Sequence, residues 1–481
     1  MPDEGVTPRS TDYGRWYLDV IREAELADYG PVRGTMIIRP YGYAIWENIQ
    51  QALDRRFKET GHQNAYFPLF IPHSFIQKEK QHVEGFAPEL ALVTVGGGKE
   101  LDEPLVVRPT SETIINHMFT QWIKSYRDLP MLLNQWANVV RWEMRTRPFL
   151  RTLEFLWQEG HTAHATYQEA EAEAMLMVNV YRDFAETDAA VPVIAGRKSR
   201  LETFAGAVHS YTIEAMMGDM RALQSGTSHN LGDNFARAFG TQFLGENNEL
   251  HFISQTSWGL STRFVGAVIM VHGDDKGLAL PPKLAPTQVI IVPIWRTEGE
   301  RTGVLNAAGR LHQQLTTAGI RASIDSTDQR TPGWKFNFWE MKGVPIRIEI
   351  GPRDIEKGTV VLARRDKPGR EGKTMGIAWD AAGERAAAML AEVQTSLLAR
   401  ARAFLSSNIH DVTGYNELQE VIAAGGWARG WWAGEDDDEL RVKEDTGATI
   451  RCLPFDQPGG AGPCLMTGKP AGEVAVFAKA Y

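Results

Sequence analysis

Residues 141–164, RWEMRTRPFLRTLEFLWQEGHTAH, constrain most strongly what this chain can fold into. The stretch mixes arginine and glutamate with large aromatic side chains, so it is not an ordinary core strand. The segments QWANVVRWEM and LRTLEFLWQEGH flank turn-like residues 145–148, which predicts an antiparallel hairpin with charge on the face that is usually buried. Buried charge is costly unless it meets a ligand or partner. A solvated hairpin with salt bridges and a ligand site therefore both stay open.

The length of the chain, 481 residues, exceeds what one hydrophobic core supports and predicts roughly two to four domains. With 43% hydrophobic and 23% charged residues, the composition is that of an ordinary globular protein. No apolar run approaches the length of a membrane span, and the N-terminal residues lack the basic and apolar regions of a signal peptide. We therefore expect a cytoplasmic chain with no membrane partner.

Cysteine content and net charge exclude further classes. Cys452 and Cys464 are the only cysteines, which excludes a disulfide framework and is typical of a reducing compartment. One bridge or two reduced structural thiols remain as alternatives. The net charge of −9 gives no general attraction to nucleic acid, so a polynucleotide partner would need a local basic patch.

Apolar periodicity indicates how the chain is organised. It predicts a helix within residues 1–29 that stops at Gly30-Pro31, and an amphipathic helix over 42–61. After the proline-rich segment LALPPKLAP, strands and helices alternate over residues 286–380, which indicates a compact α/β domain. An alanine-rich helix over 381–408 and a smaller α+β end follow, in which we expect the acidic run 435–440 to be a solvated loop.

Three groups of polar residues are candidates for a site. Thr110, Ser111 and Glu112 lie where a strand gives way to a helix, so they form either an N-cap with a capping box or a cleft that binds an ammonium group. Residues 224–229 cluster hydrogen-bonding side chains beside a glycine, which fits either a turn with a helix cap or close approach to a ligand. Arg263 opens an apolar helix against the macrodipole, which hints at a phosphate partner.

Several strings, taken together, resemble a known family. VRGTMIIRPYG, the RWE hairpin and GLSTRFVGAVIM are similar to motifs 1, 2 and 3 of the class II aminoacyl-tRNA synthetases. RPTSE, FLWQEGHTA, GTSHNLG, SWGLSTR, TPGWKFNFWEMKGVPIRIEIGPRD and the C-terminal tyrosine resemble prolyl-tRNA synthetases of the archaeal and eukaryotic type. The resemblance covers nearly the whole chain, with the strings in the family's order.

The resemblance implies an α/β and α+β multidomain fold. It comprises an antiparallel-sheet catalytic domain over 1–285, an α/β anticodon-binding domain over 286–400 and a small α+β C-terminal domain over 401–481. The span between His161 and Gly259 is short, so we expect no editing insertion. The implied reaction is ATP-dependent activation of L-proline and its transfer to tRNA(Pro), which needs positioning and electrostatics but no side-chain nucleophile.

The family also implies roles for individual residues. Arg141 and Arg263 are the expected catalytic groups, because a forked guanidinium suits bridging a phosphate and a carboxylate. The expected ATP-binding residues are Arg141, Glu143, Arg151, Thr152, Phe155, Gln224, Thr227, Ser261 and Arg263, with Gln224 also helping to place Mg²⁺. The expected proline-binding residues are Thr110, Glu112, Arg141, Trp157, Glu159, His161, Phe204, His229 and Trp258. For Glu159 and Trp258, a place behind the residues that contact proline is the alternative.

The anticodon-binding and C-terminal parts carry further expectations. Phe336, Glu340 and Arg347 match the segment that meets anticodon bases, although core packing and surface charge are alternatives. Relatives of this type hold a structural zinc on four cysteines. Here Ala433, Asp438 and Met466 stand at three of those places beside Cys464, so we expect no structural zinc while the fold is kept. We also expect Tyr481 to fold back toward the catalytic domain.

Two other functions compete with this interpretation. A silent paralogue that only binds tRNA or a regulatory partner predicts broken ATP residues, whereas Arg141, Glu143 and Arg263 are intact. A class II synthetase for threonine, histidine or glycine shares the architecture but not the RPTSE and FLWQEGH strings. The expected partners are tRNA(Pro), L-proline, ATP and a second copy of the chain, joined through the motif 1 helix, and not DNA.

Overall fold

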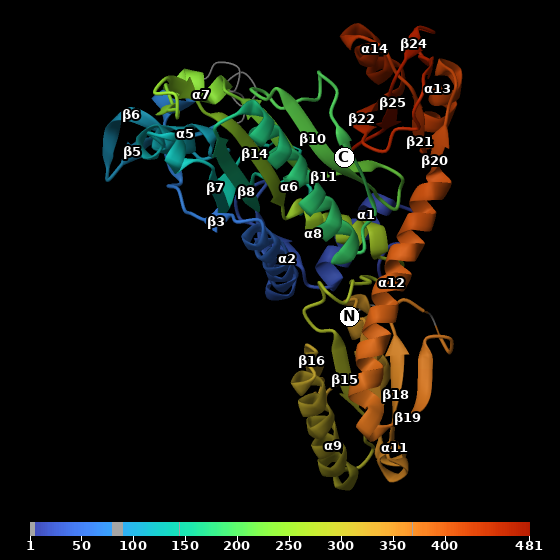
Figure 1. Cartoon of the computed structure of the whole chain (residues 1–481). Helices are drawn as coiled ribbons and strands as arrows, with labels where there is room; N and C mark the ends of the chain where they lie inside the picture. The colour runs from blue at the N-terminus through green and yellow to red at the C-terminus, as the bar shows by residue number, and fades with distance from the viewer. Residues whose placement is uncertain (1–4, 79–89, 144, 368) are drawn as a thin grey trace.

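The computed structural model describes residues 5–78, 90–143, 145–367 and 369–481. Figure 1 shows three groups of elements, with the long helix α12 (Ala382–Asn408) running from the lower group past the largest one to the C-terminal group. Among the helices in these ranges, none combines the length and the apolar character needed to cross a membrane.

The largest element is an eleven-stranded sheet whose central strands are antiparallel. Strand β22 of the C-terminal group pairs with β9, so both groups share one continuous sheet. In sheet order the strands are Ile409–Asp411 (β20), Trp427–Trp431 (β21), Val474–Ala478 (β25), Thr449–Pro454 (β22), Val193–Arg197 (β9), His209–Met216 (β10), Ala222–Gly232 (β11), Ser254–Ser261 (β14), Glu154–His164 (β8), Met131–Val140 (β7) and Gln63–Asn64 (β3).

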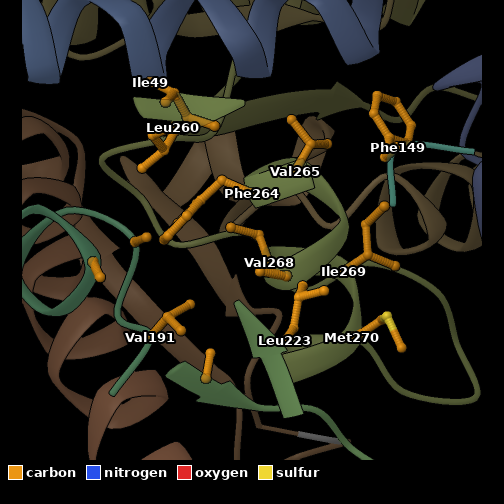
Figure 2. Close-up of a cluster of buried hydrophobic side chains, with 14 of the residues drawn as sticks. Ile49, Phe149, Val191, Leu223, Leu260, Phe264, Val265, Val268, Ile269 and Met270 are labelled. Carbon is orange, nitrogen blue, oxygen red and sulfur yellow. The ribbon is translucent and has the colours of Figure 1, made fainter. Parts of the chain in front are cut away.

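Helices cover one face of this sheet and leave the other for the site. Helix α6 (Tyr167–Thr187) begins at a capping box of Thr166 and Glu169 and packs on β11 and β14. Helix α8 (Arg263–His272) is apolar nearly all round because it is enclosed by α1 (Tyr13–Glu23), α2 (Pro40–Glu59) and the sheet. Figure 2 shows Phe264 and Val268 of α8 in this core, together with Ile49 and Leu260.

Smaller elements complete the N-terminal half. Strands β1 (Ala27–Tyr29) and β2 (Met36–Ile38) form a hairpin before α2, and β4, β6 and β5 form a three-stranded sheet. The remaining elements are β4 (Phe70–Pro72), α3 (His73–Gln77), β5 (Ala91–Gly96), β6 (Lys99–Val107), α5 (Glu112–Trp122), η2 (Tyr126–Asp128), α7 (Asn234–Phe239), β12 (Gln242–Leu244) and β13 (Leu250–Phe252).

The lower group in Figure 1 has a separate core around a five-stranded mixed sheet, in the order β16-β15-β17-β18-β19. This is the alternating α/β pattern that the sequence predicts. Its elements are β15 (Val289–Pro293), α9 (Glu298–Thr317), β16 (Ala322–Ile324), α10 (Pro332–Met341), β17 (Ile346–Ile350), α11 (Pro352–Lys357), β18 (Thr359–Arg364), β19 (Lys373–Ala378) and η3 (Trp379–Ala381).

The C-terminal group packs α13 (Tyr415–Ala423) and α14 (Asp436–Thr446) around its strands and the short pair β23 (Gly462–Pro463) and β24 (Pro470–Ala471). Cys452 and Cys464 are both buried free thiols. The chain ends back on the large group, as predicted, because the Tyr481 hydroxyl donates to the Asp219 carboxylate at 2.6 Å.

Three sequence expectations are wrong in detail. The first helix ends at Glu23, and the backbone then forms strand β1 before Gly30. The acidic run is not a loop but the first turn of α14, where carboxylates face the positive end of the helix dipole. The predicted hairpin strands end at Val140 and resume at Glu154, so Arg141 and Arg151 lie on the connection between the strands.

Candidate active site

One cavity of about 250 Å³ opens on the face of the central sheet that the helices leave uncovered. Strands β8, β11 and β14 form its floor. The strand register brings the floor residues together, since Ser257 of β14 lies opposite both His161 of β8 and His229 of β11. The lining includes Thr110, Glu112, Arg141, Phe155, Trp157, Glu159, His161, Phe204, Gln224, Thr227, His229, Trp258, Ser261 and Arg263, all of them predicted from the sequence.

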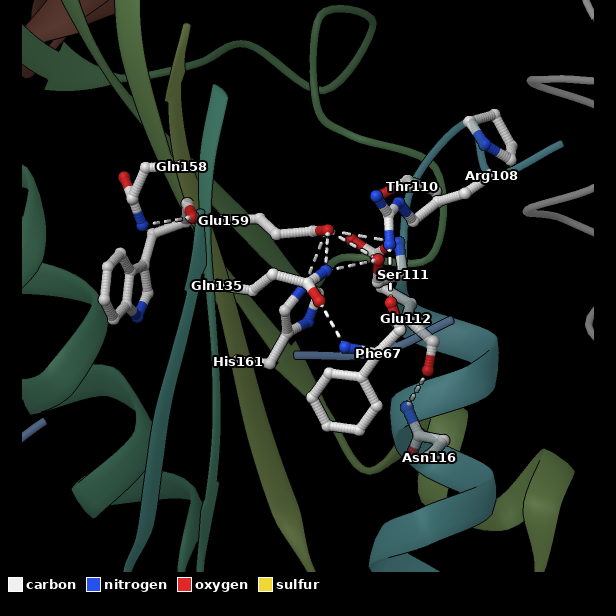
Figure 3. A network of polar contacts seen from close by, with 12 residues as sticks. Phe67, Arg108, Thr110, Ser111, Glu112, Asn116, Gln135, Gln158, Glu159 and His161 are labelled. Carbon is white, nitrogen blue, oxygen red and sulfur yellow. Dashed lines mark hydrogen bonds and ion pairs between the residues drawn. The ribbon is translucent and has the colours of Figure 1, made fainter. Parts of the chain in front are cut away.

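A buried network holds the carboxylate of Glu159 at one end of this cavity (Figure 3). Its Oε1 accepts hydrogen bonds from Ser111 Oγ at 2.5 Å and Gln135 Nε2 at 2.8 Å. Its Oε2 accepts from the Ser111 backbone N–H and bonds His161 Nε2 at 3.0 Å. Ser111 is the N-cap residue of α5, yet its side chain makes no capping bond. The predicted N-cap position is therefore confirmed, and the capping box is wrong, because the Ser111 side chain serves this network instead.

Burial shifts the pKa values of both ionisable partners of this network toward the neutral forms, and the contact between the two partners reverses both shifts. Burial alone lowers the pKa of His161, but the hydrogen bond and charge of Glu159, with the charge of Glu112, raise the pKa above its ordinary value. Burial likewise raises the pKa of Glu159, and the hydrogen bonds from His161, Ser111 and Gln135 bring it below its ordinary value. The pair is therefore held as imidazolium and carboxylate at moderately acidic pH.

A second histidine nearby is held neutral. Burial lowers the pKa of His229 to about 3. Its Nδ1 shares a hydrogen bond of 2.8 Å with Ser210 Oγ, and Phe204 stacks on its ring with the ring centroids 4.7 Å apart. Thr110 donates to the Glu112 carboxylate beside them. Flat apolar surfaces therefore stand next to carboxylate acceptors at this end of the cavity.

Arginines gather at the opposite end. Arg263 is the first residue of α8, and its Nε donates to the Leu150 carbonyl at 3.0 Å. Burial, followed by the charges of Arg141 and Arg151, lowers the pKa of Arg263 to about 10. The Arg141 guanidinium lies 5.6 Å from the ring centroid of Phe155 and 5.5 Å from that of Trp157. Clustered cations of this kind create a site for a polyanion.

Three of the predicted ATP residues lie outside the lining of this cavity. Glu143 and Arg151 face each other across the hairpin connection, with 3.6 Å between Oε2 and Nε. Thr152 is buried and donates to the Glu154 carbonyl at 2.7 Å. Arg151 lines an adjoining cavity of about 120 Å³ together with Arg263 and Tyr481, so it remains next to the arginine cluster.

Trp258 borders the cavity but its ring does not face it. The ring packs against Phe57, His62 and Tyr181 in the core under α6, and a Cβ on Gly160 would lie 2.1 Å from it. Alternation along β14 explains this, because Ser257 and Gly259 share the cavity face and Trp258 lies on the other. The Trp258 ring therefore lies behind the cavity floor, which is one of the two places expected for it from the sequence.

Seven lining residues were not predicted from the sequence: Lys198, Glu202, Ser225, Gly226, Ser257, Gly259 and Leu260. Ser257 is the most informative of them, because its buried hydroxyl has no hydrogen-bond partner among the described residues. The period of two from Ser261 through Gly259 to Ser257 was the available signal, since alternate residues of a strand share a face.

The predicted anticodon residues come together elsewhere. Phe336, Glu340 and Arg347 line one cavity of about 230 Å³ in the five-stranded domain, with Lys276 and Lys373. The Arg347 guanidinium lies 3.9 Å from the Phe336 ring centroid. A stacked aromatic and guanidinium among cations suit a nucleotide base and phosphate.

Comparisons with known proteins agree with this geometry. The family model of the tRNA synthetase class II core domain (G, H, P, S and T) matches residues 93–272. The anticodon binding domain model matches 288–380, and the model of the prolyl-tRNA synthetase C-terminal domain matches 415–481. These three matches, in this order, define a class II aminoacyl-tRNA synthetase.

Curated relatives narrow the class. Proline--tRNA ligase, chloroplastic/mitochondrial, of Arabidopsis thaliana is 67% identical over 481 residues, covering all of this chain and 89% of the relative. Proline--tRNA ligase of Roseiflexus castenholzii is 57% identical over 483 residues and covers both chains fully, and that of Rubrobacter xylanophilus is 56% identical over 480 residues and covers 99% of each. The chain therefore belongs to the prolyl-tRNA synthetase family.

Proposed function

We propose that this chain activates L-proline with ATP to prolyl-adenylate and transfers the prolyl group to the 3′ end of tRNA(Pro), releasing AMP and diphosphate. The observation that carries the proposal is the polarity of one cavity. Its Glu112, Glu159 and His229 end offers acceptors and flat apolar walls, and its Arg141 and Arg263 end offers cations. A cationic ring amine and a polyphosphate fit those two ends respectively.

The chemical step requires electrostatic help and no side-chain nucleophile. A proline carboxylate oxygen forms a bond to the α-phosphorus of ATP while the bond from that phosphorus to the bridging oxygen of diphosphate breaks. Negative charge grows on the phosphoryl oxygens. Arg141 of the cation end donates from its Nε to the Pro109 carbonyl at 3.2 Å, next to Thr110 of the proline end, so its fork is suited to hold both carboxylate and phosphate. In the second step, a tRNA ribose hydroxyl attacks the prolyl carbonyl carbon, and AMP leaves.

The proline end fits a secondary amine. In this proposal, Thr110, Glu112 and His229 hold the imino nitrogen and carboxylate, and Trp157 and Phe204 form the walls for the ring. Their common place in the cavity lining supports these roles, and Glu159 bonds His161 beside them. Such walls discriminate weakly against smaller side chains, because a missing methylene is worth about 1–3 kcal/mol. We therefore expect some activation of alanine or cysteine.

The remaining residues support the proposal that ATP binds at the arginine end. Phe155 lines the cavity and offers a stacking surface for adenine, while Glu143, Arg151 and Thr152 stand on the connection beside it. Thr227, Ser261 and Arg263 border the phosphate region. Gln224, also in the lining, is proposed to help hold Mg²⁺, which when bound would neutralise charge on the phosphates.

The five-stranded domain is proposed to bind the anticodon of tRNA(Pro). The cavity lined by Phe336, Glu340 and Arg347 supports this role, since it combines a stacking face, an acceptor and a cation. Loss of tRNA charging with retained diphosphate exchange in Phe336→Ala and Arg347→Ala would be the expected signature.

We propose that the C-terminal domain holds no zinc. Cys464, Met466 and Ala433 pack together in its hydrophobic core, and Asp438 accepts from the Glu435 N–H at 3.0 Å as part of the α14 cap. One thiol cannot form a tetrahedral site. Stoichiometric zinc in metal analysis of the purified protein would overturn the proposal.

We propose a homodimer formed through α2 and the hairpin before it. Exposed apolar side chains on these elements, Tyr29, Val32, Ile37 and Tyr43, support it. Sedimentation of the purified chain tests it, and a monomer at micromolar concentration would contradict it. The cytoplasmic location also stays a proposal, tested by fractionation of the tagged chain.

Proline-dependent exchange of labelled diphosphate into ATP is the deciding experiment. We expect exchange with proline and at least about 100-fold less with threonine, because the pocket walls are apolar. No exchange with proline would support a silent paralogue, and stronger exchange with threonine would support another class II enzyme.

A further inference from the structure

One wall of the cavity is held by the C-terminal domain. Lys198, Glu202 and Phe204 line the cavity, and all three belong to the segment 198–204 between β9 and β10, here called the pocket loop. Ser199 of the pocket loop donates its hydroxyl to Glu439 Oε1 at 2.7 Å, and each residue is only 7% exposed. Glu439 lies in the first turn of α14, in the acidic run that the sequence left without a role.

Ser199 also organises the pocket loop internally. Its Oγ accepts a hydrogen bond from the Glu202 N–H at 3.3 Å, and its carbonyl accepts one from Thr203 Oγ1 at 2.8 Å. The next residue, Phe204, donates its N–H to Ser210 Oγ at 3.0 Å and stacks on His229. The path from α14 to the amino-acid end of the cavity therefore runs from Glu439 to Ser199, through the bond between Ser199 and Thr203, and along the chain to Phe204.

The surrounding contacts differ in what they contribute. Arg200 of the pocket loop forms an ion pair with Asp436, but the Arg200 side chain is 81% exposed, so solvent screens the pair. Strand β22 pairs with β9 just before the pocket loop, and the Lys198 N–H donates to the Ser210 carbonyl at 2.8 Å, so the start of the loop is held by backbone bonds. The buried bond from Ser199 to Glu439 is the contact whose loss leaves a buried polar group unpaired.

We propose that Glu439, acting through Ser199, is a positioning residue for the amino-acid substrate: α14 holds the pocket loop so that Phe204 keeps its place as a wall of the site. The inference rests on the proposed function, because it assigns that wall to proline. The C-terminal domain thereby takes part in substrate affinity while contributing no group to the cavity lining. This positioning role differs from a contribution to overall stability, since it predicts a change in the KM for proline and not in the KM for ATP.

Diphosphate exchange on the full-length chain tests this role. Ser199→Ala and Glu439→Ala each remove one partner, and we expect KM for proline to rise about tenfold, from the loss of a buried hydrogen bond. KM for ATP and kcat should stay within about twofold, because Phe204, the wall that the contact positions, stacks on His229 at the amino-acid end. Glu439→Gln retains an oxygen that accepts the Ser199 hydroxyl and should restore KM. Glu444→Ala, exposed on the same helix, is the control and should match wild type.

The double variant Ser199→Ala/Glu439→Ala should raise KM for proline no further than either single variant, because both remove one contact. A lowered Tm with unchanged KM for proline, or additive KM effects, would overturn the positioning role. If Glu439→Ala does not fold, Ser199→Ala decides, since it removes one oxygen only. Absent exchange in wild type would overturn the proposed function, whereas normal wild-type exchange with unshifted variants would overturn only this inference.

Discussion

The two ends of the cavity are built on opposite principles. At the proline end, Glu159 and His161 are 2% and 4% exposed and bonded to each other. Both lie on the regular strand β8, and Glu159 is also bonded to Ser111 at the start of α5. At the ATP end, Arg141 and Arg151 are carried by the connection between β7 and β8 and are more exposed. The proline end, proposed for a small rigid substrate, is a preformed network. The ATP end, proposed for a long charged substrate, has arginines on an irregular segment.

This difference follows from what each substrate demands. Selecting one ring among similar amino acids needs fixed walls, and burial makes every misplaced polar group costly. Polyphosphate is recognised chiefly by charge, which acts over longer distances and tolerates movement of its partners. Changes to the buried network at the proline end should therefore alter affinity and stability together, and changes at the ATP end should alter catalysis or ATP affinity with little effect on stability.

Arg141→Ala should give the largest effect, because it removes the group shared by both ends. We expect proline-dependent exchange to fall by about 10³-fold or more, with little change in Tm. Exchange kinetics and thermal unfolding of the same preparation check this. Arg182→Ala, on an exposed face of α6, is the matched control. Near-normal exchange in Arg141→Ala would remove this residue from the chemistry.

Glu159→Ala should come next, and it should affect affinity and stability at once. The change removes the carboxylate that His161, Ser111 and Gln135 share, and breaking a buried pair costs about 3–5 kcal/mol. We expect a clear fall in Tm and a KM for proline raised about 100-fold, measured by exchange. A variant with normal stability and affinity would show that the proline end is not preorganised by this network.

The pH dependence of stability isolates the same pair. The folded pKa of His161 is above its ordinary 6.5, so its contribution is complete below pH 6.5 and is lost as pH rises through the folded pKa. The folded pKa of Glu159 is below 4.5, so its contribution is present above pH 4.5 and is lost as pH falls. The Tm difference between wild type and Glu159→Gln/His161→Gln should therefore peak between pH 4.5 and 6.5. A difference that does not change with pH would contradict the charged pair.

Trp258 and Trp157 provide a matched test of which aromatic belongs to the site. Trp258→Phe should lower stability by about 2 kcal/mol through a partly filled core, with KM for proline within about twofold. Trp157→Phe should raise KM for proline and leave Tm nearly unchanged, because Trp157 lines the cavity. The opposite pattern would return Trp258 to the proline site.

The sequence was sufficient to predict cavity residues where a short local string also carries the chemistry. Arg141, Glu112 and Arg263 were predicted and do line one cavity, because the strings that carry them are both local and functional. The packing of the Trp258 ring was beyond the sequence, because it depends on the space beside Gly160, in a strand about 100 residues away. The contact of Glu439 with Ser199 was out of reach for the same reason, since it joins residues 240 apart.

The smallest effect should come from Glu143→Gln at the ATP end. Glu143 pairs with Arg151 at 3.6 Å, and Arg151 is 46% exposed in its side chain, so the pair itself stabilises little. If Glu143 reads the adenine amino group, the amide keeps one acceptor, and KM for ATP should rise by only about threefold with KM for proline unchanged. Exchange kinetics with ATP and with an adenine analogue that lacks the amino group check this. An equal rise for both nucleotides would assign Glu143 to holding Arg151, and would still leave the contrast between a bonded proline end and an adaptable ATP end intact.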